Sequence, residues 1–595
     1  MARVGGSVEG GFRFRFRGPR RFLLALALAF TAASGASAGD RVAPPKAAAD
    51  VILTNARVYT VEEAQPWAEA VAIKDGKILA VGSARQVART KGARTRVIDL
   101  GGRMLMPAFG DAHAHPMFGG LTQARCPIVE GKTPAQYQAM IAACVAKKPG
   151  TETVYGVGWA QTNFPGISPR KETLDAISRD RPILFGSFDG HAMWANSKAL
   201  ELAGITKDTP DPPGGRIGRD PQTGEPNGAL WEFSAMALVD KLVPPPTEAE
   251  LEASIVYVTR RFNSLGITNW HDAGVEYADD GSSPMVEAYR SVRDRGVLTA
   301  HVVIDLKWQN ERGLEQIPGI LRAAERARSY GLNARSVKFY LDGVLPQHTA
   351  LMIEPYDGTA DRGKPGIPAE VLSAAMVALD AEGFQGHVHA EGDGAVRESL
   401  DAFEAARKAN GDRGNRPMIS HMNVIDPADQ PRFGKLGVYA VFQPYWASNY
   451  DDMDLQKQAI GPRRAGFIYP TANVVRAGGK MAYGSDWPVD SANPLDGLQV
   501  ALTRTNPLEP ARGPLLADQA VTLAEAIRSY TLHVAEVNHL DKETGSIAPG
   551  KDADLIVLDR NLFEIPATEI SKAKVVLTLF AGKPVFGGVG SLSAE

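Results

Sequence analysis

Eight short apolar segments recur through most of this chain, and the stretches between them have helical spacing. The segments are RMLMPAFGDAHAH, GITNWHDAG, LTAHVVIDL, SVKFYLDG, FQGHVHAEGD, RPMISHMN, VYAVFQPYW and KMAYGSDWP. A separating stretch such as PAEVLSAAMVALDAEG places apolar residues three and four positions apart, which is the helical period. Strands that alternate with helices in this way are typical of a parallel (β/α)8 barrel. We therefore predict an α/β fold with a TIM-like barrel over residues 107–539.

The connection between the first and second of these strands is longer than an ordinary barrel loop. It runs over residues 116–265, approximately, and contains TVYGVGW, PILFGSFDGH and a stretch rich in proline and glycine. Long loops at the carboxyl ends of barrel strands commonly cover the active site. We expect the same of this insertion.

Both ends of the chain have the character of β-structure without a helical pattern. Near the start, ADVILTNARVYTV, EAVAIKDGKILAVG and TRVIDLGGRMLMP join β-branched runs through Asn, Asp-Gly or Gly-Gly turns. Near the end, GSIAPGKDADLIVLD and AKVVLTLFAGKPVF have the same character. We predict that residues 48–106 and 540–590 pair into one small β-sandwich domain.

Polar residues lie at the ends of the predicted barrel strands. A single histidine at a strand end is more often structural than a metal ligand. However, the carboxyl ends of all barrel strands meet at one mouth, and the two histidines of HAH point to the same face. A buried lysine without a partner is also costly, and therefore rare. A metal centre is thus predicted from six convergent residues: His113, His115, Lys338, His389, His421 and Asp486.

In this order, the segments resemble the amidohydrolase superfamily, and in particular its YtcJ-like branch, which includes N-substituted formamide deformylases. The matching stretches are PAFGDAHAH, FDGHAMWANSKAL, GITNWHDAG, VKFYLDG, HVHAEGD, SHMNVIDPADQPRFGKLGV, FQPYWAS, GSDWPVDSANPLDGL and GSIAPGKDADLIVLD. Together they extend over nearly the whole chain beyond its first 38 residues. The resemblance implies a hydrolase that uses one or two divalent metal ions.

The resemblance also divides the ligands between two ions. It implies that His113 and His115 bind one ion, and that Asp486 completes this first site. It further implies that His389 and His421 bind a second ion. Histidine and carboxylate ligands suit zinc, which we expect, with iron, manganese and cobalt as alternatives.

The resemblance gives Lys338 the role of a bridging ligand, as a carbamate formed with carbon dioxide. Chemistry gives an independent reason for the modification. A lysine ammonium has no lone pair for a cation, whereas a carbamate supplies two anionic oxygens. Two ions about 3.5 to 4 Å apart could then share one hydroxide.

The motif FDGHAMWAN lies in the insertion and matches an element of the branch that resembles a substrate contact. We predict that His191 is catalytic, as a donor to the developing oxyanion. We also predict that Trp194 and Asn196 contact the substrate. Tyr445 is a further substrate-binding candidate, although aromatic residues are equally ordinary in a core. The other aromatic candidates are Trp159, Phe164, Trp231, Trp446 and Trp487.

The segment HVHAEGD departs from the pattern of the branch at His387 and Glu391. His387 faces the same way as His389, so it is either a hydrogen-bond partner of a ligand or an alternative ligand. We take His389 as the ligand because its position in the segment matches the family. His271 and Asp272, at the end of the second strand, are expected to support the ligands.

The predicted reaction is hydrolysis of a C–N bond in an amide-like substrate, N-acyl or N-formyl, by a metal-activated water. Asp486 accepts the proton of the water and later delivers it to the leaving nitrogen. One alternative is an ester or lactone hydrolase or a deaminase on the same scaffold, and Lys338 argues against mononuclear deaminases. Another alternative is a non-catalytic binding protein, which the complete ligand set disfavours.

The charge balance limits the class of partner. Lys and Arg number 65 and Asp and Glu 68, which gives a formal net charge of −3. This balance offers no electrostatic reason to expect a nucleic acid or a membrane surface. We expect a small-molecule substrate, and the sequence leaves a homodimer open.

Residues 1–38 have the pattern of a cleaved signal peptide. Arginines from Arg13 to Arg21 precede the apolar run FLLALALAF, and Ala-Ser-Ala follows. The run is too short to span a bilayer comfortably, so we predict an exported, periplasmic or secreted protein without a stable membrane anchor. Export by the Sec or the Tat route stays open. In that compartment Cys126 and Cys144, the only cysteines, form a disulfide or stay free thiols.

Overall fold

The structure is a computed structural model that describes residues 48–128, 131–148 and 150–588. The predicted signal peptide at residues 1–38 lies outside these ranges. Within them, no helix combines the length and the apolar character that crossing a bilayer requires.

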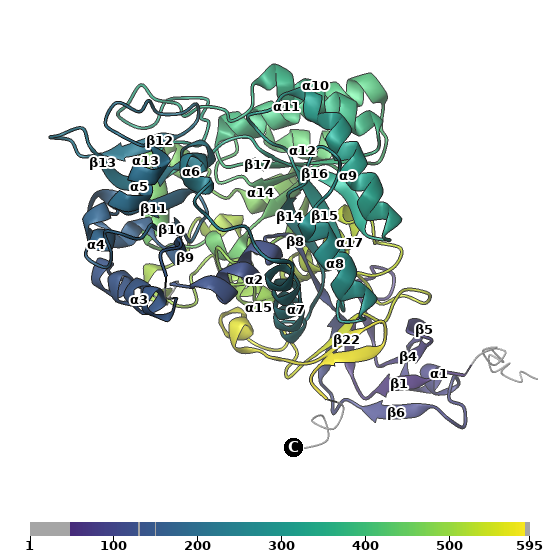
Figure 1. The fold of residues 1–595 in the computed structure, drawn as a ribbon. Helices are drawn as coiled ribbons and strands as arrows, with labels where there is room; N and C mark the ends of the chain where they lie inside the picture. The colour runs from purple at the N-terminus through teal and green to yellow at the C-terminus, as the bar shows by residue number, and fades with distance from the viewer. Residues whose placement is uncertain (1–47, 129–130, 149, 589–595) are drawn as a thin grey trace, which may run out of the picture. The chain divides into compact units, whose positions relative to one another are not determined.

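An eight-stranded parallel sheet curls into a nearly closed barrel (Figure 1). Around the sheet, in chain order, its strands are β8 (Phe109–Ala114), β14 (Ile267–Val275), β15 (His301–Lys307), β16 (Asn333–Tyr340), β17 (Gln385–Ala390), β18 (Met418–His421), β19 (Tyr439–Phe442) and β20 (Lys480–Tyr483). The two edges meet because Asp486 N donates to His113 O, at 2.8 Å. Each strand overlaps one predicted segment, so the predicted barrel is confirmed.

Helices separate the barrel strands along the chain, as the sequence pattern predicts. They are α7 (Glu248–Ser264), α8 (Pro284–Asp294), α9 (Ile317–Ser329), α10 (Ala369–Ala381), α11 (Asp393–Asn410), α12 (Gln430–Leu436), α13 (Asp451–Ala465), α14 (Thr471–Arg476), α15 (Pro494–Thr503), α16 (Leu523–Tyr530) and α17 (Leu532–Val537). The start of α7 is a capping box, in which Thr247 and Glu250 each accept the other's backbone N–H. Its buried side, with Leu251, Ile255, Val258 and Phe262, has helical spacing.

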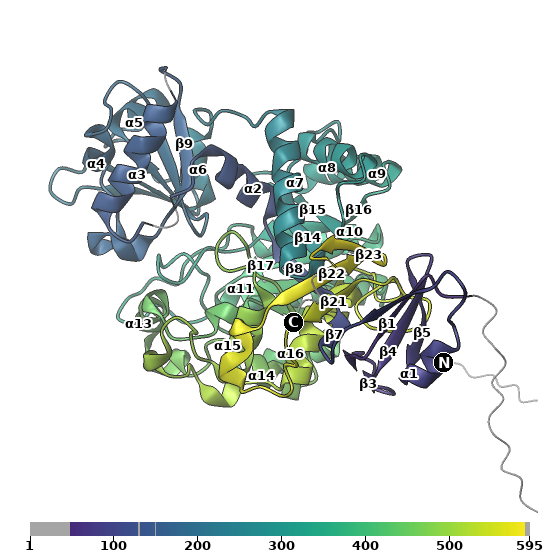
Figure 2. The same cartoon turned by 90° about the horizontal axis from the view of Figure 1, so that it is seen from below.

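Two further sheets are built from the chain ends. One contains β1 (Val51–Thr54), β4 (Ala70–Lys74), β5 (Lys77–Gly82) and β6 (Arg96–Asp99), with α1 (Ala84–Ala88) after β5. The other contains β2 (Arg57–Tyr59), β3 (Trp67–Ala68), β7 (Met104–Pro107), β21 (Leu555–Leu558), β22 (Val575–Phe580) and β23 (Lys583–Phe586). In this second sheet the C-terminal β21 pairs antiparallel with β7. Figure 2 shows the yellow C-terminal strands beside β7. Leu53 and Val71 of the first sheet share one core with Leu105 and Val557 of the second.

The insertion after β8 forms its own five-stranded sheet. In sheet order its strands are β12 (Arg216–Arg219), β13 (Pro226–Trp231), β11 (Ala192–Ala195), β10 (Ile183–Ser187) and β9 (Val154–Trp159). Its helices are α2 (Pro116–Arg125), α3 (Pro134–Lys147), α4 (Lys171–Asp175), α5 (Ser197–Ala203) and α6 (Glu232–Asp240). Side chains alternate between the two faces of a strand. Accordingly, Phe185 and Trp194 lie in one apolar core, whereas Leu184 and Met193 lie in a second.

The insertion also contains both cysteines. Cys126 follows α2, Cys144 belongs to α3, and the two are joined as a disulfide with their Cα atoms 6.2 Å apart. That separation is ordinary for a disulfide. Of the two states that the sequence leaves open, the structure has the disulfide.

A histidine at the start of β15 links the barrel to the strands of the chain ends. His301 Nε2 lies 2.9 Å from Asp554 Oδ2, and Asp554 Oδ1 accepts from Ala581 N at 2.8 Å. Burial lowers the pKa of His301, but the hydrogen bond with Asp554 and its charge outweigh burial, so the pKa is raised. Protonated His301 therefore stabilises this junction.

We predict that His301→Gln changes how stability depends on pH. A histidine pKa raised above its unfolded value of about 6.5 adds stability that is complete below that pH and is lost as pH rises through the folded-state pKa. The melting temperature of the variant should therefore differ most from that of the parent near pH 6, and less at pH 9. Thermal unfolding across this range measures the difference. For a control, burial lowers the pKa of His539 to about 4, so His539→Gln should give a pH dependence of the opposite sign, with the variant gaining stability relative to the parent as pH falls from 9 towards 6. A constant difference for His301→Gln would refute the role of the ion pair.

Candidate metal centre

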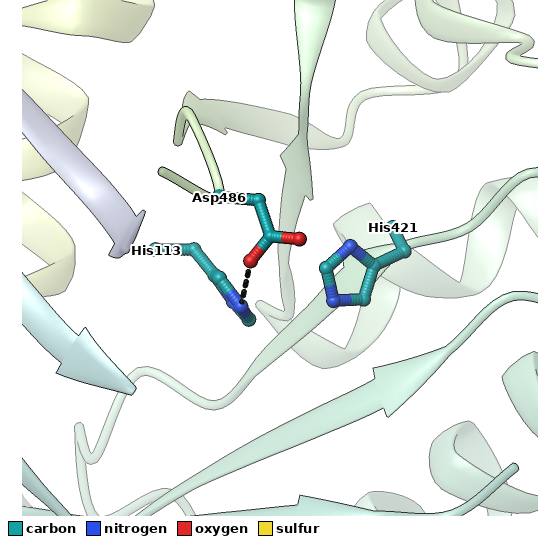
Figure 3. A group of neighbouring side chains, drawn as sticks. All are labelled: His113, His421 and Asp486. Carbon is teal, nitrogen blue, oxygen red and sulfur yellow. Dashed lines mark ion pairs between the residues drawn. The ribbon is translucent and has the colours of Figure 1, made fainter. Parts of the chain in front are cut away.

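Three side chains from distant parts of the chain converge where the barrel edges meet. Asp486 Oδ1 lies 3.0 Å from His113 Nε2 and 3.2 Å from His115 Nε2. The ring of His421 lies 4.7 Å from the ring of His113, and Figure 3 shows His421 facing the pair formed by His113 and Asp486. Single ligand atoms of His113, His421 and Asp486 all lie within 4.8 Å of one another. This spacing allows one cation to bind all three.

The local backbone is adapted to bring these residues together. Asp486 has φ of 57° and His421 has φ of 81°, in the left-handed region that residues with a side chain rarely adopt. Such a conformation costs roughly 1–3 kcal/mol and persists only where the surrounding structure imposes it. Gly484 shows the close approach, because a Cβ there would lie 2.7 Å from His113 N. The end of β20 thus fits against β8 only without a side chain at this position.

Lys338 and His389 lie beside the same cluster. Lys338 Nζ is 3.3 Å from both ring nitrogens of His113, and its side chain is fully buried. Burial lowers the pKa of Lys338 to about 7, although Asp486 and Asp305 oppose the shift. The ring of His389 lies 4.5 Å from that of His421. The structure therefore brings together all six strand-end residues that the sequence singles out.

The buried imidazoles of the cluster carry no positive charge. Burial, with the neighbouring Lys338 and other histidines, lowers the pKa of His113, His389 and His421 well below the ordinary value. These imidazoles are neutral, and each offers a lone pair. Asp486 Oδ1 is buried and has no hydrogen-bond partner among the described residues. Imidazole lone pairs and a carboxylate oxygen that point toward one another can bind a divalent cation between them. Imidazole and carboxylate ligands suit zinc.

Hydrogen bonds orient two of the imidazoles. His421 Nδ1 lies 3.0 Å from Gln443 Oε1, so it donates there and leaves Nε2 free. His389 Nε2 lies 3.2 Å from Gly343 O, so it donates there and leaves Nδ1 free. Metal-binding histidines usually donate their other ring N–H to an acceptor in this way.

His387 contacts the ligand candidate His113 and the carboxylate Asp305. Its Nε2 lies 2.9 Å from His113 Nδ1, and its Nδ1 lies 2.5 Å from Asp305 Oδ2. Burial and the charge of Lys338 lower the pKa of His387 to about 3, so this ring is neutral. His271, expected to support the ligands, has its Nε2 3.4 Å from Asp305 Oδ1. The sequence reasoning missed Asp305, whose only signal is a carboxylate inside an apolar strand.

His191 reaches the barrel from the insertion. Its ring lies 5.3 Å from that of His389, and its Nδ1 lies 2.7 Å from Glu232 Oε2. Burial lowers the pKa of His191, but the charge of Glu232 and its hydrogen bond outweigh burial and raise the pKa to about 9. The other oxygen of Glu232 accepts from Thr349 Oγ1 at 2.5 Å. Glu232 was also missed, although it directly follows the strand in PNGALWE.

The structure does not place Trp194 and Asn196 at the metal centre. Both side chains are completely buried. The Trp194 indole donates to Arg170 O at 3.0 Å, and Asn196 caps α5 and donates to Arg181 O at 2.8 Å. Because their polar atoms are occupied inside the insertion, these contacts support a structural role and not the predicted substrate contact. Three other aromatic candidates, Trp159, Phe164 and Trp231, lie in the same core.

Aromatic side chains do surround the accessible part of the centre. Trp446 stacks on His421 with the ring centroids 5.5 Å apart, and the half-buried Tyr445 precedes it. Phe233 is 37% exposed, and its ring lies 5.2 Å from His191 and 4.9 Å from Tyr340. A substrate that reaches the histidines therefore meets apolar aromatic side chains.

A (β/α)8 barrel with its polar cluster at the carboxyl ends of the strands has the architecture of barrel enzymes, whose active sites lie at this face. The chain belongs to the amidohydrolase family, because the model described as "Amidohydrolase family" matches residues 96–586.

Relatives resemble the chain over most of its length. Protein LONG AFTER FAR-RED 3 of Arabidopsis thaliana is 30% identical and the match covers 91% of this chain and 92% of that protein. The putative amidohydrolase YtcJ of Bacillus subtilis is 28% identical, with 89% and 98% covered. The N-substituted formamide deformylase of Arthrobacter pascens is 27% identical, with 91% and 99% covered. These matches confirm the resemblance to the YtcJ-like branch.

A solved structure supports the fold. It is an uncharacterized metal-dependent hydrolase from Pyrococcus horikoshii, with a TM-score of 0.65 and 22% identity. The match covers 87% of this chain and 99% of that one.

Proposed function

We propose that this chain is a metal-dependent hydrolase that cleaves the C–N bond of an amide-like small molecule. One observation carries the proposal: a buried Asp486 oxygen, which has no hydrogen-bond partner in the part of the chain that the structure describes, faces His113 and His115 at 3.0 and 3.2 Å. A carboxylate oxygen and two imidazole nitrogens that converge in this way fit a cation between them. Membership of the amidohydrolase family supports hydrolysis as the reaction.

In this proposal the six strand-end residues hold two ions. His113, His115 and Asp486 would hold the first, and His389 and His421 would hold the second, with zinc as the metal that suits these ligands. Lys338 would bridge them as a carbamate. Since burial lowers the pKa of Lys338 to about 7, much of it is a free amine at neutral pH. That amine adds to carbon dioxide by forming an N–C bond and losing one proton.

The residues of the centre have distinct tasks in hydrolysis. Bound divalent ions lower the pKa of water and polarise a carbonyl. Asp486 can accept a proton from the attacking water, because no hydrogen-bond donor among residues 48–128, 131–148 and 150–588 engages its Oδ1. The same proton then goes from Asp486 to the leaving nitrogen as the C–N bond breaks.

His191 is placed to stabilise negative charge on the carbonyl oxygen. With a pKa raised to about 9 by Glu232, it carries a proton on each ring nitrogen at neutral pH. Nδ1 donates to Glu232, which leaves the N–H of Nε2 for the oxygen that becomes negative. Glu232 would hold the ring in this orientation.

An apolar acyl or amine group fits the surroundings of the centre. Phe233 lies beside His191 and Trp446 stacks on His421, and aromatic residues are common in sites for small ligands. The similarity to an N-substituted formamide deformylase favours N-formyl or N-acyl amines as the substrate class.

We also propose that the protein is exported. The disulfide between Cys126 and Cys144 supports this, because disulfides persist mainly in oxidising compartments such as the periplasm.

The function is tested with a panel of N-formyl and N-acyl amines and their matching esters. We expect amide cleavage by zinc-loaded protein that binds one to two ions per chain, loss of cleavage after chelation, and recovery when zinc is added. Product amine and elemental content are the measurements. Cleavage of esters alone would contradict the proposed bond, and protein that binds no metal would contradict the metal-dependent mechanism.

We predict that Lys338→Ala loses most of the bound metal and the activity, because the bridge between the two ions is removed. Short-chain carboxylic acids that imitate the carbamate should restore part of both. Lys307→Ala is a matched control, since Lys307 lies opposite Lys338 in the strand register and pairs with Glu276 at 3.1 Å. Full metal content and activity in Lys338→Ala would mean that this lysine has only a structural role.

We predict that Asp486→Asn separates catalysis from metal binding. The amide keeps the size of the side chain and one oxygen donor but cannot accept the proton. Turnover on a panel substrate should fall by at least roughly 10² to 10⁴-fold, as expected for a lost general acid/base, while metal content falls only in part. The exposed Asp280 provides a control as Asp280→Asn. Near-normal turnover in Asp486→Asn would eliminate Asp486 as the proton carrier.

A further inference from the structure

His113 is connected through other side chains to a carboxylate deeper in the barrel. Its Nδ1 lies 2.9 Å from both Ser420 Oγ and His387 Nε2. Ser420 Oγ lies 2.6 Å from His387 Nε2, and His387 Nδ1 lies 2.5 Å from Asp305 Oδ2. All four side chains are completely buried. Bulk water therefore does not compete for these hydrogen bonds.

The barrel geometry explains why these residues meet. His113, Asp305 and His387 belong to β8, β15 and β17, which are the first, third and fifth strands of the barrel. Inward-pointing side chains of alternate barrel strands lie in a common layer. The three residues therefore contact one another across the barrel interior, although none of their strands are hydrogen-bonded neighbours.

The carboxylate sets the direction of every hydrogen bond in this connection. A carboxylate oxygen accepts, so His387 donates to Asp305 from Nδ1 at 2.5 Å. Its other ring nitrogen, Nε2, then accepts, and Ser420 Oγ and His113 Nδ1 lie 2.6 and 2.9 Å from it. A proton on Nδ1 of His113 completes these hydrogen bonds, and the lone pair of its Nε2 then faces Asp486.

The other two buried imidazoles have weaker acceptors. His421 donates to an amide oxygen of Gln443, and His389 donates to the backbone carbonyl of Gly343. Asp342 Oδ1 is 3.6 Å from His389 Nε2, which exceeds hydrogen-bond distance. Of these three rings, only His113 therefore leads to a carboxylate. An anionic acceptor makes the opposite ring nitrogen a stronger ligand.

His271, Asp305 and His387 are themselves close enough to suggest a metal site. The distances favour a hydrogen bond instead. His387 Nδ1 and Asp305 Oδ2 are 2.5 Å apart, which is the contact of a hydrogen-bond donor with its acceptor. Two ligands each about 2.0 to 2.2 Å from one zinc ion in a tetrahedral site would lie well beyond that separation.

We propose that Asp305 is a positioning residue for the metal ligand His113: through His387 and Ser420, it holds the proton on Nδ1 and keeps Nε2 free for the ion. This inference rests on the proposed function only in assuming that an ion binds at His113. It assigns a role to a carboxylate that touches neither the ion nor the substrate.

The test is the zinc affinity of Asp305→Asn, measured by competition with a chelator. Asparagine has nearly the same shape, but its amide can donate as well as accept, so it no longer sets the direction of the hydrogen bonds. We expect the affinity of one of the ions to fall by about 10 to 100-fold, which is typical when the hydrogen-bond partner of a ligand is lost. The other ion should be retained. Cobalt-substituted protein should show an altered absorption spectrum, which a remote packing change would not produce.

His271→Gln is the matched control, because it removes the imidazole that faces the other oxygen of Asp305 and leaves in place the hydrogen bonds that connect Asp305 to His113. Its zinc affinity should stay within a few-fold of the parent. If Asp305→Asn does not fold, the paired variant Asp305→Leu with His387→Phe removes the connection while filling the space with apolar groups, and the same selective loss is expected.

Three results would overturn the inference. The first is parental zinc affinity in Asp305→Asn, or in the paired variant. The second is an equal loss in Asp305→Asn and His271→Gln. The third is an additional ion in the parent that His271→Gln abolishes, which would make this group a metal site. If the parent binds no zinc at all, the proposed function fails instead.

Discussion

The candidate centre depends on the contact that closes the barrel between β8 and the end of β20. There Asp486 N donates to His113 O at 2.8 Å, and Gly484 allows the two backbones to approach closely. This contact brings the proposed base next to two histidines from the other edge of the sheet. It also imposes the left-handed conformation of Asp486, whose cost the packed barrel offsets. Without closure, the ligands at the two edges would remain apart.

A second constraint is the electrostatic balance inside the closed barrel. Burial holds the imidazoles of His113, His389 and His421 neutral. Unpaired charges are costly in such an interior, so a buried carboxylate requires a compensating cation or a hydrogen-bond donor. Asp305 and Asp486 each have one buried oxygen without a hydrogen-bond partner among the described residues, but His387 lies 2.5 Å from the other oxygen of Asp305. The two carboxylates therefore differ in that Asp305 is connected to His113 through side chains, whereas Asp486 faces His113 and His115 directly.

The sequence was informative where chemistry coincides with a strand end. HAH, GSDWP and the lysine of SVKFYLDG could be located because parallel strands place their carboxyl ends at one face of a barrel. The same reasoning does not extend to FDGHAMWAN, in which His191 reaches the barrel but Trp194 and Asn196 are buried in the insertion. An insertion follows no such rule, so its sequence does not reveal which side chains face the barrel.

The sequence by itself determined the barrel, its strands and the identity of the residues at their ends, because hydrophobic period and strand order are local properties. Only the tertiary structure decided which polar groups meet. Asp305 reaches His387 across an intervening strand, and Glu232 of the insertion orients His191. These contacts depend on barrel closure, on layers formed by alternate strands and on side-chain direction. Such features arise only when distant segments pack together, so spacing along the chain does not encode them.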